Sequence, residues 1–163
     1  MKRQYSKKYL VWLFPTVVAG MIFLFSSQHA EESSHLSNIF VQILLQVREK
    51  LGVFPQVSLL HLFSTLVRKG AHVTEYIILC ISFLTAFWVS GIRGKGRNIA
   101  SFVLTFGYAC TDEFHQLFVP GRAGRFTDVL IDSSGALVLS LIVVLVMHSR
   151  TMRGKRVRRR KSK

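Results

Sequence analysis

The hydropathy pattern of the chain is dominated by four long apolar stretches, at about residues 9–27, 67–90, 99–119 and 129–148. Each has roughly the 20 residues that an α-helix needs to cross about 30 Å of hydrocarbon. Half of all residues are hydrophobic, which is high for a domain that must keep a polar surface. The pattern predicts one all-α domain over residues 1–163, an integral membrane four-helix bundle located in the cell membrane.

The segments between the apolar stretches carry charge of opposite sign on alternate sides. If the N-terminus lies inside, 16 of the 22 Lys and Arg residues fall on the inner side and no acidic residue accompanies them. The other six basic residues and all eight acidic residues fall outside. Cytoplasmic loops of membrane proteins favour Lys and Arg, so this asymmetry predicts a multi-pass protein with both termini in the cytoplasm.

The longest connection follows the first stretch and has its own periodicity. Apolar residues recur at helical spacing over residues 36–51, which predicts an amphipathic helix that ends at Gly52 and Pro55. It could lie on the outer membrane surface or pack on the bundle. A second short apolar segment, residues 57–63, leads into the next span. The first stretch is predicted to be an uncleaved span, because Gln28 occupies a position where signal cleavage requires a small residue.

The remaining composition narrows the choice of partners. Residues 150–163 form a basic tail directly after the fourth span, where anionic lipid head groups are the expected partner. No interleaved aromatic residues or nucleic-acid-binding motif accompany this tail, so nucleic acid is not an expected partner. Cys80 and Cys110 both fall inside predicted spans, where they are expected to pack rather than to form a disulfide.

Polar and ionisable residues recur at one depth in three of the spans. They are Lys69, His72, Glu75 and Tyr76 in the second span, Asp112, Glu113, His115 and Gln116 in the third, and Asp128 and Asp132 in the fourth. Helical spacing places Asp112, His115 and Gln116 on one face, with Glu113 to its side. A rise of 1.5 Å per residue puts these layers roughly 7–12 Å below the outer ends of their spans. We expect one polar cavity that opens to the outside.

The charges of this layer do not balance. Its five carboxylates face three cations expected near them, Lys69, Arg122 and Arg125, and two histidines. A buried carboxylate without a partner must be protonated, hydrated or bound to a cation. This surplus favours a functional site over a purely structural network, which remains the alternative. A divalent metal is compatible with the i, i+3 pairs of the layer, although that spacing is common.

Four segments of the chain resemble the VanZ-like family of bacterial membrane proteins. They are FSSQ at residues 25–28, RKGAHVTEY at 68–76, TDEFHQLFVPGR at 111–122 and DVLIDSSGA at 128–136. The resemblance implies these signature positions: Lys69, His72, Tyr76, Asp112, Glu113, His115, Gln116, Pro120, Gly121, Arg122, Asp128, Asp132 and Gly135. The family is named after a protein associated with low-level resistance to the glycopeptide teicoplanin, and the resemblance carries no settled reaction.

The chemistry of the layer predicts roles for its residues. The candidates for catalysis are Glu75, Asp112, Glu113 and His115. The candidates for substrate binding are Lys69, His72, Tyr76, Gln116, Arg122, Asp128 and Asp132. Cationic side chains suit a phosphate or carboxylate, and a site in the outer leaflet suits a lipid-linked or other cell-envelope molecule. The alternatives are a non-catalytic scaffold or binding factor and a proton-coupled carrier, which the apolar inner halves of the second and fourth spans disfavour.

Overall fold

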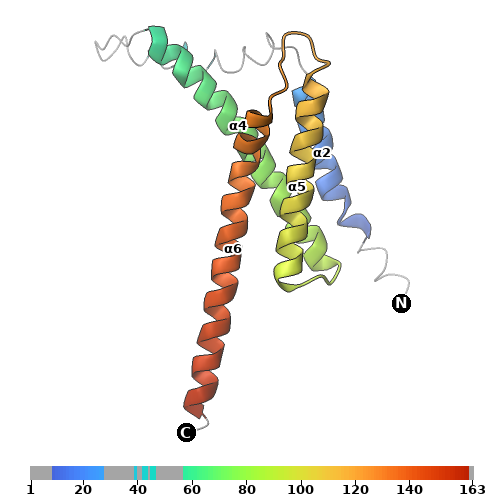
Figure 1. The fold of residues 1–163 in the computed structure, drawn as a ribbon, viewed down its shortest axis with the longest axis vertical. Coiled ribbons are helices and arrows are strands. Elements are labelled where there is room, and N and C mark those ends of the chain that lie inside the picture. The colour runs from blue at the N-terminus through green and yellow to red at the C-terminus, as the bar shows by residue number, and fades with distance from the viewer. Residues whose placement is uncertain (1–8, 28–38, 40–41, 44, 47–56, 162–163) are drawn as a thin grey trace.

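The computed structural model describes residues 9–27, 39, 42–43, 45–46 and 57–161, with side chains described over 62–153 in the last range. Four helices form there: α2 (Leu13–Ser26), α4 (Val57–Val89), α5 (Gly94–Gln116) and α6 (Phe126–Lys161). No strand occurs among these residues (Figure 1). The all-α class predicted from the sequence is therefore confirmed for the described part of the chain.

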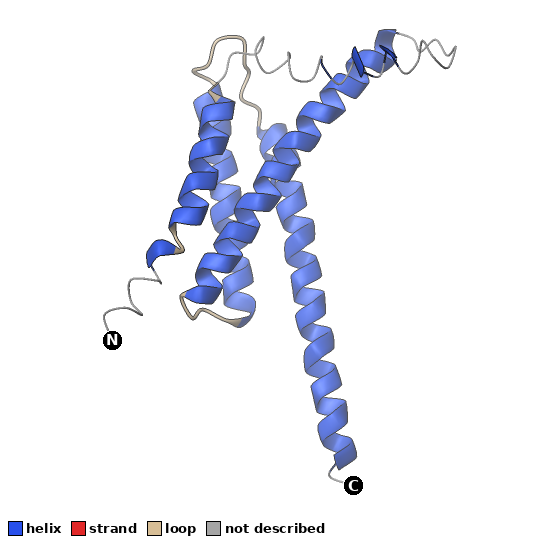
Figure 2. Ribbon diagram, turned by 180° about the vertical axis from the view of Figure 1, so that it is seen from behind, coloured by secondary structure: helices blue, strands red, loops and turns tan. Residues whose placement is uncertain are grey.

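The helices alternate in direction, as Figure 1 shows. α2 and α5 run towards the end of the bundle that carries the α5–α6 connection, whereas α4 and α6 run away from it. α4, α5 and α6 pack on one another, and α2 packs mainly on α4. The start of α2 and the end of α6 consequently lie on the same side of the bundle, and α6 continues well beyond its neighbours (Figure 2).

The distribution of side chains is the reverse of that in a water-soluble domain. Large apolar residues such as Leu24, Val103 and Leu145 are exposed on the outside of the bundle. Buried positions hold a small apolar core around Tyr76 and Leu79, together with many polar side chains. A contiguous apolar exterior of this kind indicates a lipid or protein partner rather than water.

Two helices are long and apolar enough to cross a membrane, over Leu62–Val89 and Phe126–Arg153. These contain the second and fourth predicted spans. α2 is a shorter apolar helix of 14 residues. α5 has a lower mean hydropathy, because polar residues follow its buried face. Length and composition therefore support two of the four predicted spans, and the structure does not test the other two.

The helix boundaries differ from the predicted ones at three places. α4 begins at Val57, so the short apolar segment before the second span is continuous with that span. α5 runs from Gly94 to Gln116, which is earlier at both ends than the expected 99–119. α6 continues through the basic tail to Lys161, because Arg and Lys are good helix formers and no proline follows to stop the helix. The sequence pattern marked where the chain is apolar, not where the helices end.

The predicted amphipathic helix over 36–51 lies mostly outside the described residues. The described positions within it, 39, 42–43 and 45–46, are helical. Ile39 and Ile43 each expose about half of their surface, so the described bundle does not cover these two apolar side chains.

The half of the bundle near the α4–α5 connection is more polar than the sequence suggested. Ser82 on α4, Ser101 and Thr105 on α5 and Ser140 on α6 are all buried. The hydroxyls of Thr105 and Ser101 donate to backbone carbonyls one turn earlier in α5, an arrangement that leaves little exposed polarity. Small hydroxylated residues of this kind allow close helix packing in membranes.

Candidate functional site

Three helices and the α5–α6 connection enclose a polar cavity of about 350 Å³. This volume lies at the low end of the range of about 300–1,000 Å³ that is usual for ligand pockets. The cavity is lined by Thr65, Arg68, Lys69, His72, Glu113, Gln116, Gly121, Arg122, Ala123, Arg125, Asp128 and Asp132. The structure thus brings residues from α4, α5 and α6 to one place at the end of the bundle where α6 begins.

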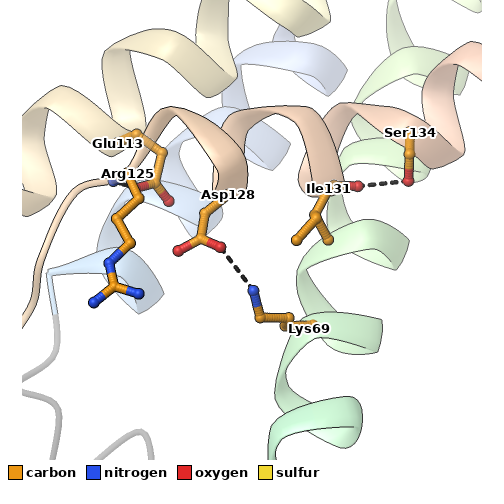
Figure 3. A network of polar contacts seen from close by, with 6 residues as sticks. All are labelled: Lys69, Glu113, Arg125, Asp128, Ile131 and Ser134. Atoms are coloured by element: carbon orange, nitrogen blue, oxygen red, sulfur yellow. Dashed lines mark hydrogen bonds and ion pairs between the residues drawn. The ribbon is translucent and has the colours of Figure 1, made fainter.

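An ion pair joins α4 to the start of α6 across this cavity. Lys69 Nζ donates to Asp128 Oδ1 at 2.7 Å, and both side chains are about one third exposed. Figure 3 shows Arg125 and Asp128 extending to the same side of the ribbon, the side on which Lys69 approaches. The pair fixes the register between the two helices, and the nearby start of α6 favours negative charge at Asp128.

Two further guanidinium groups on the cavity have no carboxylate partner. In the part of the chain that the structure describes, no carboxylate lies within ion-pair distance of Arg68 or Arg125. Arg122 lies close to Arg68. Burial lowers the pKa of Arg122 from its ordinary value, and the Arg68 cation lowers it further. Cationic groups that repel one another around a cavity favour a bound anion.

Glu113 anchors the α5–α6 connection to the end of α5. Its buried Oε2 accepts a hydrogen bond from the backbone N–H of Arg125 at 2.9 Å (Figure 3). Gly124 makes this approach possible, because a Cβ at that position would overlap the backbone oxygen of Glu113. The carboxylate therefore positions the connection that carries Arg122 and Arg125 over the cavity.

Asp112 lies deeper, between α4 and α5, and does not line the cavity. Its Oδ2 accepts hydrogen bonds from the Tyr76 hydroxyl at 3.1 Å and from the Gln116 amide at 3.2 Å. All three side chains are buried, and Asp112 Oδ1 has no hydrogen-bond partner among the described residues. Gln116 also lines the cavity and so connects this inner network to the cavity wall.

His72 and Glu75 meet one turn apart on α4. His72 Nδ1 lies 3.4 Å from Glu75 Oε2, within ion-pair distance but without the alignment of a good hydrogen bond. His72 lines the cavity, where Asp132 is an electrostatic neighbour, whereas Glu75 lies beside the cavity. Asp132 is only 4% exposed and lines the cavity wall on α6.

The structure places His115 differently from the expected face. Its ring packs on Phe23 of α2, with the ring centroids 4.5 Å apart, and it does not line the cavity. Glu113, which helical spacing put to the side, takes the cavity position instead. Helical spacing gives the angle between residues of one helix, but it does not show which neighbouring helix each face meets.

Sequence reasoning missed three residues of this region. Arg68 was not among the predicted site residues, but it lines the cavity. Thr65 also lines it, one turn earlier on α4. Ser26, at the end of α2, is fully buried and its hydroxyl has no partner. Two features of the sequence could have indicated these residues. They are the adjacent cations Arg68 and Lys69, and the polar residue Ser26 at the end of the first apolar stretch.

Among the described residues, no group of three or more His, Cys, Asp and Glu side chains is placed to hold a metal ion. The i, i+3 pairs that suggested a metal therefore do not converge into a larger group. The cavity instead combines cationic side chains with carboxylates and one imidazole.

The fold and the site together define an all-helical protein of membrane type, with a charged cavity between helices at one end of the bundle. The chain belongs to the VanZ/LLP1 family, whose family model matches residues 11–147. This confirms the resemblance seen in the sequence motifs, since the match covers α2, α4, α5, most of α6 and all residues that line the cavity. No curated protein and no solved structure matches the chain significantly.

Proposed function

We propose that the bundle lies in the cell membrane with both termini in the cytoplasm. The apolar exterior and the two helices of spanning length support this placement. Arg93, Lys95 and Arg97 surround the α4–α5 connection, and no acidic residue accompanies them. That end of the bundle faces the cytoplasm under the positive-inside rule, so the cavity at the opposite end faces the outer leaflet.

We further propose that the cavity binds the anionic head group of an envelope lipid or lipid-linked molecule. The observation that carries this proposal is the convergence of four cationic side chains, Arg68, Lys69, Arg122 and Arg125, on one cavity. Among the described residues, Lys69 pairs with Asp128, and no carboxylate lies within ion-pair distance of Arg68 or Arg125. Guanidinium and ammonium groups are the usual ligands of phosphate in proteins, and at low dielectric their attraction is strong.

An amphiphilic ligand fits the surroundings of the cavity. Leu62 and Leu66 are exposed on α4, one turn from Thr65 and Lys69 and on the adjoining face of the helix. A head group held by the cations would place its hydrocarbon chain along this apolar face. The cavity therefore has both of the surfaces that a membrane lipid requires.

The cavity also narrows the candidates for proton transfer. His72, Glu113 and Asp132 line it, whereas Asp112, Glu75 and His115 lie behind or beside it. General acid–base catalysis requires a group within hydrogen-bond reach of the reacting atom. Of the four predicted catalytic residues, Glu113 is thus the one that could touch a bound molecule, and Asp112 has the contacts of a positioning residue.

Binding of a soluble short-chain lipid tests the proposal. We expect the full-length protein, in a zwitterionic detergent, to bind dioctanoyl phosphatidic acid and not dioctanoyl phosphatidylcholine in titration calorimetry. Removal of two charge-assisted contacts in Arg68→Gln/Arg125→Gln should weaken binding by roughly a hundredfold. Lys95→Gln, an exposed cation at the other end of the bundle, is the matched control and should bind as the wild type does.

Two results would count against this function. If the wild type bound both lipids equally, the cavity would not be selective for anions. If the double variant bound phosphatidic acid as tightly as the wild type, Arg68 and Arg125 would not contribute to the site. The teicoplanin association of the VanZ-like family supplies a cellular comparison. Host cells that carry the double variant should lose any change in teicoplanin susceptibility that the wild type confers, at equal membrane abundance.

A further inference from the structure

The wall of the cavity is rich in hydrogen-bond acceptors that the protein itself does not use. Lys69 occupies one oxygen of Asp128, and the backbone of Arg125 occupies one oxygen of Glu113. Each carboxylate has a second oxygen with further acceptor capacity. Beneath a cationic rim, the cavity therefore offers several acceptors to a ligand.

Asp132 is the clearest case, because no hydrogen bond from a described residue is among the interactions of its carboxylate. Its side chain is 4% exposed and lines the cavity. The charged neighbours of Asp132 include His72 and the carboxylates Glu113, Asp128 and Asp112. Tyr76 is also an electrostatic neighbour, but its hydroxyl donates to Asp112. A buried carboxylate is costly unless hydrogen-bond donors meet it, so a ligand that brings donors to Asp132 would be strongly favoured.

Hydroxyl and ammonium groups are the two kinds of donor that lipid head groups carry. The charges lining the cavity distinguish between them. Four cationic side chains face three carboxylates, which leaves a surplus of one positive charge with His72 neutral. A positive surplus favours a head group with a net negative charge. A phosphodiester that carries hydroxyls has that charge, whereas a phosphoethanolamine is neutral overall.

We propose that the ligand is a phosphodiester lipid with a hydroxyl-bearing head group, a polyol or a sugar, whose hydroxyls donate to Asp132 while its phosphate meets Arg68 and Arg125. This inference rests on the proposed function and specifies its substrate class. The cavity is large enough for a head group of this kind, since its volume falls within the range of small-molecule pockets.

The test compares four dioctanoyl lipids on the full-length protein. The lipids are phosphatidylglycerol, phosphatidylmethanol, phosphatidylethanolamine and phosphatidylcholine, titrated in lauryldimethylamine oxide, a detergent that has no sugar hydroxyls. Phosphatidylmethanol matches the charge of phosphatidylglycerol but lacks the hydroxyls. We expect the wild type to bind phosphatidylglycerol roughly tenfold more tightly than phosphatidylmethanol, the effect of one hydrogen bond to a charged acceptor. In Asp132→Asn this preference should shrink, while Lys95→Gln should retain it.

The possible results distinguish a preference for hydroxyls from the binding of anionic lipids in general. Equal binding of phosphatidylglycerol and phosphatidylmethanol, both tighter than phosphatidylcholine, would overturn the hydroxyl inference and leave the anion site intact. Tighter binding of phosphatidylethanolamine than of phosphatidylglycerol would overturn it in favour of an amine. If Asp132→Asn kept the full preference for phosphatidylglycerol over phosphatidylmethanol, Asp132 would not be the acceptor of the hydroxyl hydrogen bond. If no anionic lipid binds more tightly than phosphatidylcholine, the proposed function itself is wrong. The wild-type comparison needs no variant to fold.

Discussion

At the scale of one residue, Asp112 is a buried carboxylate whose hydrogen bonds hold helices together and do not reach the cavity. Both of its hydrogen-bond donors, the Tyr76 hydroxyl and the Gln116 amide, meet the same oxygen. The Tyr76 contact links α4 to α5 in the centre of the polar layer. Since Asp112 does not line the cavity, its contacts act on a ligand only through the helices and through Gln116.

The Tyr76–Asp112 contact should be measurable as stability. Tyr76→Phe removes a donor from a buried carboxylate, so we expect a loss of about 1.5 kcal/mol in the free energy of unfolding. Reversible unfolding in mixed micelles measures this quantity. Tyr9→Phe is the control, because Tyr9 is 75% exposed and its hydroxyl should contribute little. A Tyr76→Phe protein as stable as the control would show that the contact does not hold the helices together.

At the same scale, the sequence located the polar layer but not the orientation of each side chain. The residues of the layer could be predicted because a charged group in a span is costly and is seldom placed without a role. The positions of Glu113 and His115 could not be predicted. They are two residues apart on α5, and which of them faces the cavity depends on where α2 and α6 pack. Only the assembled helices determine that.

At the scale of elements, Gly135 marks a close approach of α6 to α4. A Cβ at this position would lie 2.7 Å from methyl carbons of Val73 and Ile77. The helices therefore approach at a point where α6 has no side chain, two turns from the Lys69–Asp128 pair. Small residues at helix crossings are a general device of membrane proteins.

Gly135→Ala should destabilise the protein by about 1–3 kcal/mol, because the added methyl group overpacks the contact and the β-branched Val73 cannot turn away. The same substitution at Gly107 of α5 is the matched control. A Cβ there meets nothing within 4 Å, so Gly107→Ala should be neutral or stabilising, as alanine favours helices. Unfolding in mixed micelles compares the two. Partial recovery in Gly135→Ala/Val73→Ala would identify the overlap as the cause, and equal effects at both glycines would argue against it.

Element boundaries were the least predictable part of the fold. The hydropathy pattern identified the cores of all four helices because apolar length is encoded directly in the chain. It did not show that α4 starts at Val57 or that α6 ends at Lys161. Both extensions consist of residues compatible with a helix, and no strong breaker marks where the apolar core stops. Helical structure therefore continues past the change in composition.

At the scale of the whole molecule, the alternating helix directions place the cavity opposite the basic connection and the basic tail. Cysteine labelling tests the proposed topology. A membrane-impermeant maleimide should label Ala123→Cys in intact cells, and it should label Lys95→Cys and Thr151→Cys only after lysis. The native Cys80 is buried and Cys110 lies within α5, so the unsubstituted protein serves as the background control. If the labelling pattern were the reverse, the orientation of the protein would be inverted and the cavity would face the cytoplasm.

The uninterrupted course of α6 has a mechanical consequence. One straight rod of 36 residues carries Asp128 and Asp132 in its opening turns and arginines and lysines in its closing ones. Its close approach to α4 at Gly135 lies roughly 10 Å along the helix from Asp128 and roughly 39 Å from Lys161. Leverage about this point is close to four to one, so a slight tilt that a captured head group imposes on the short arm would swing the basic end through a much wider arc.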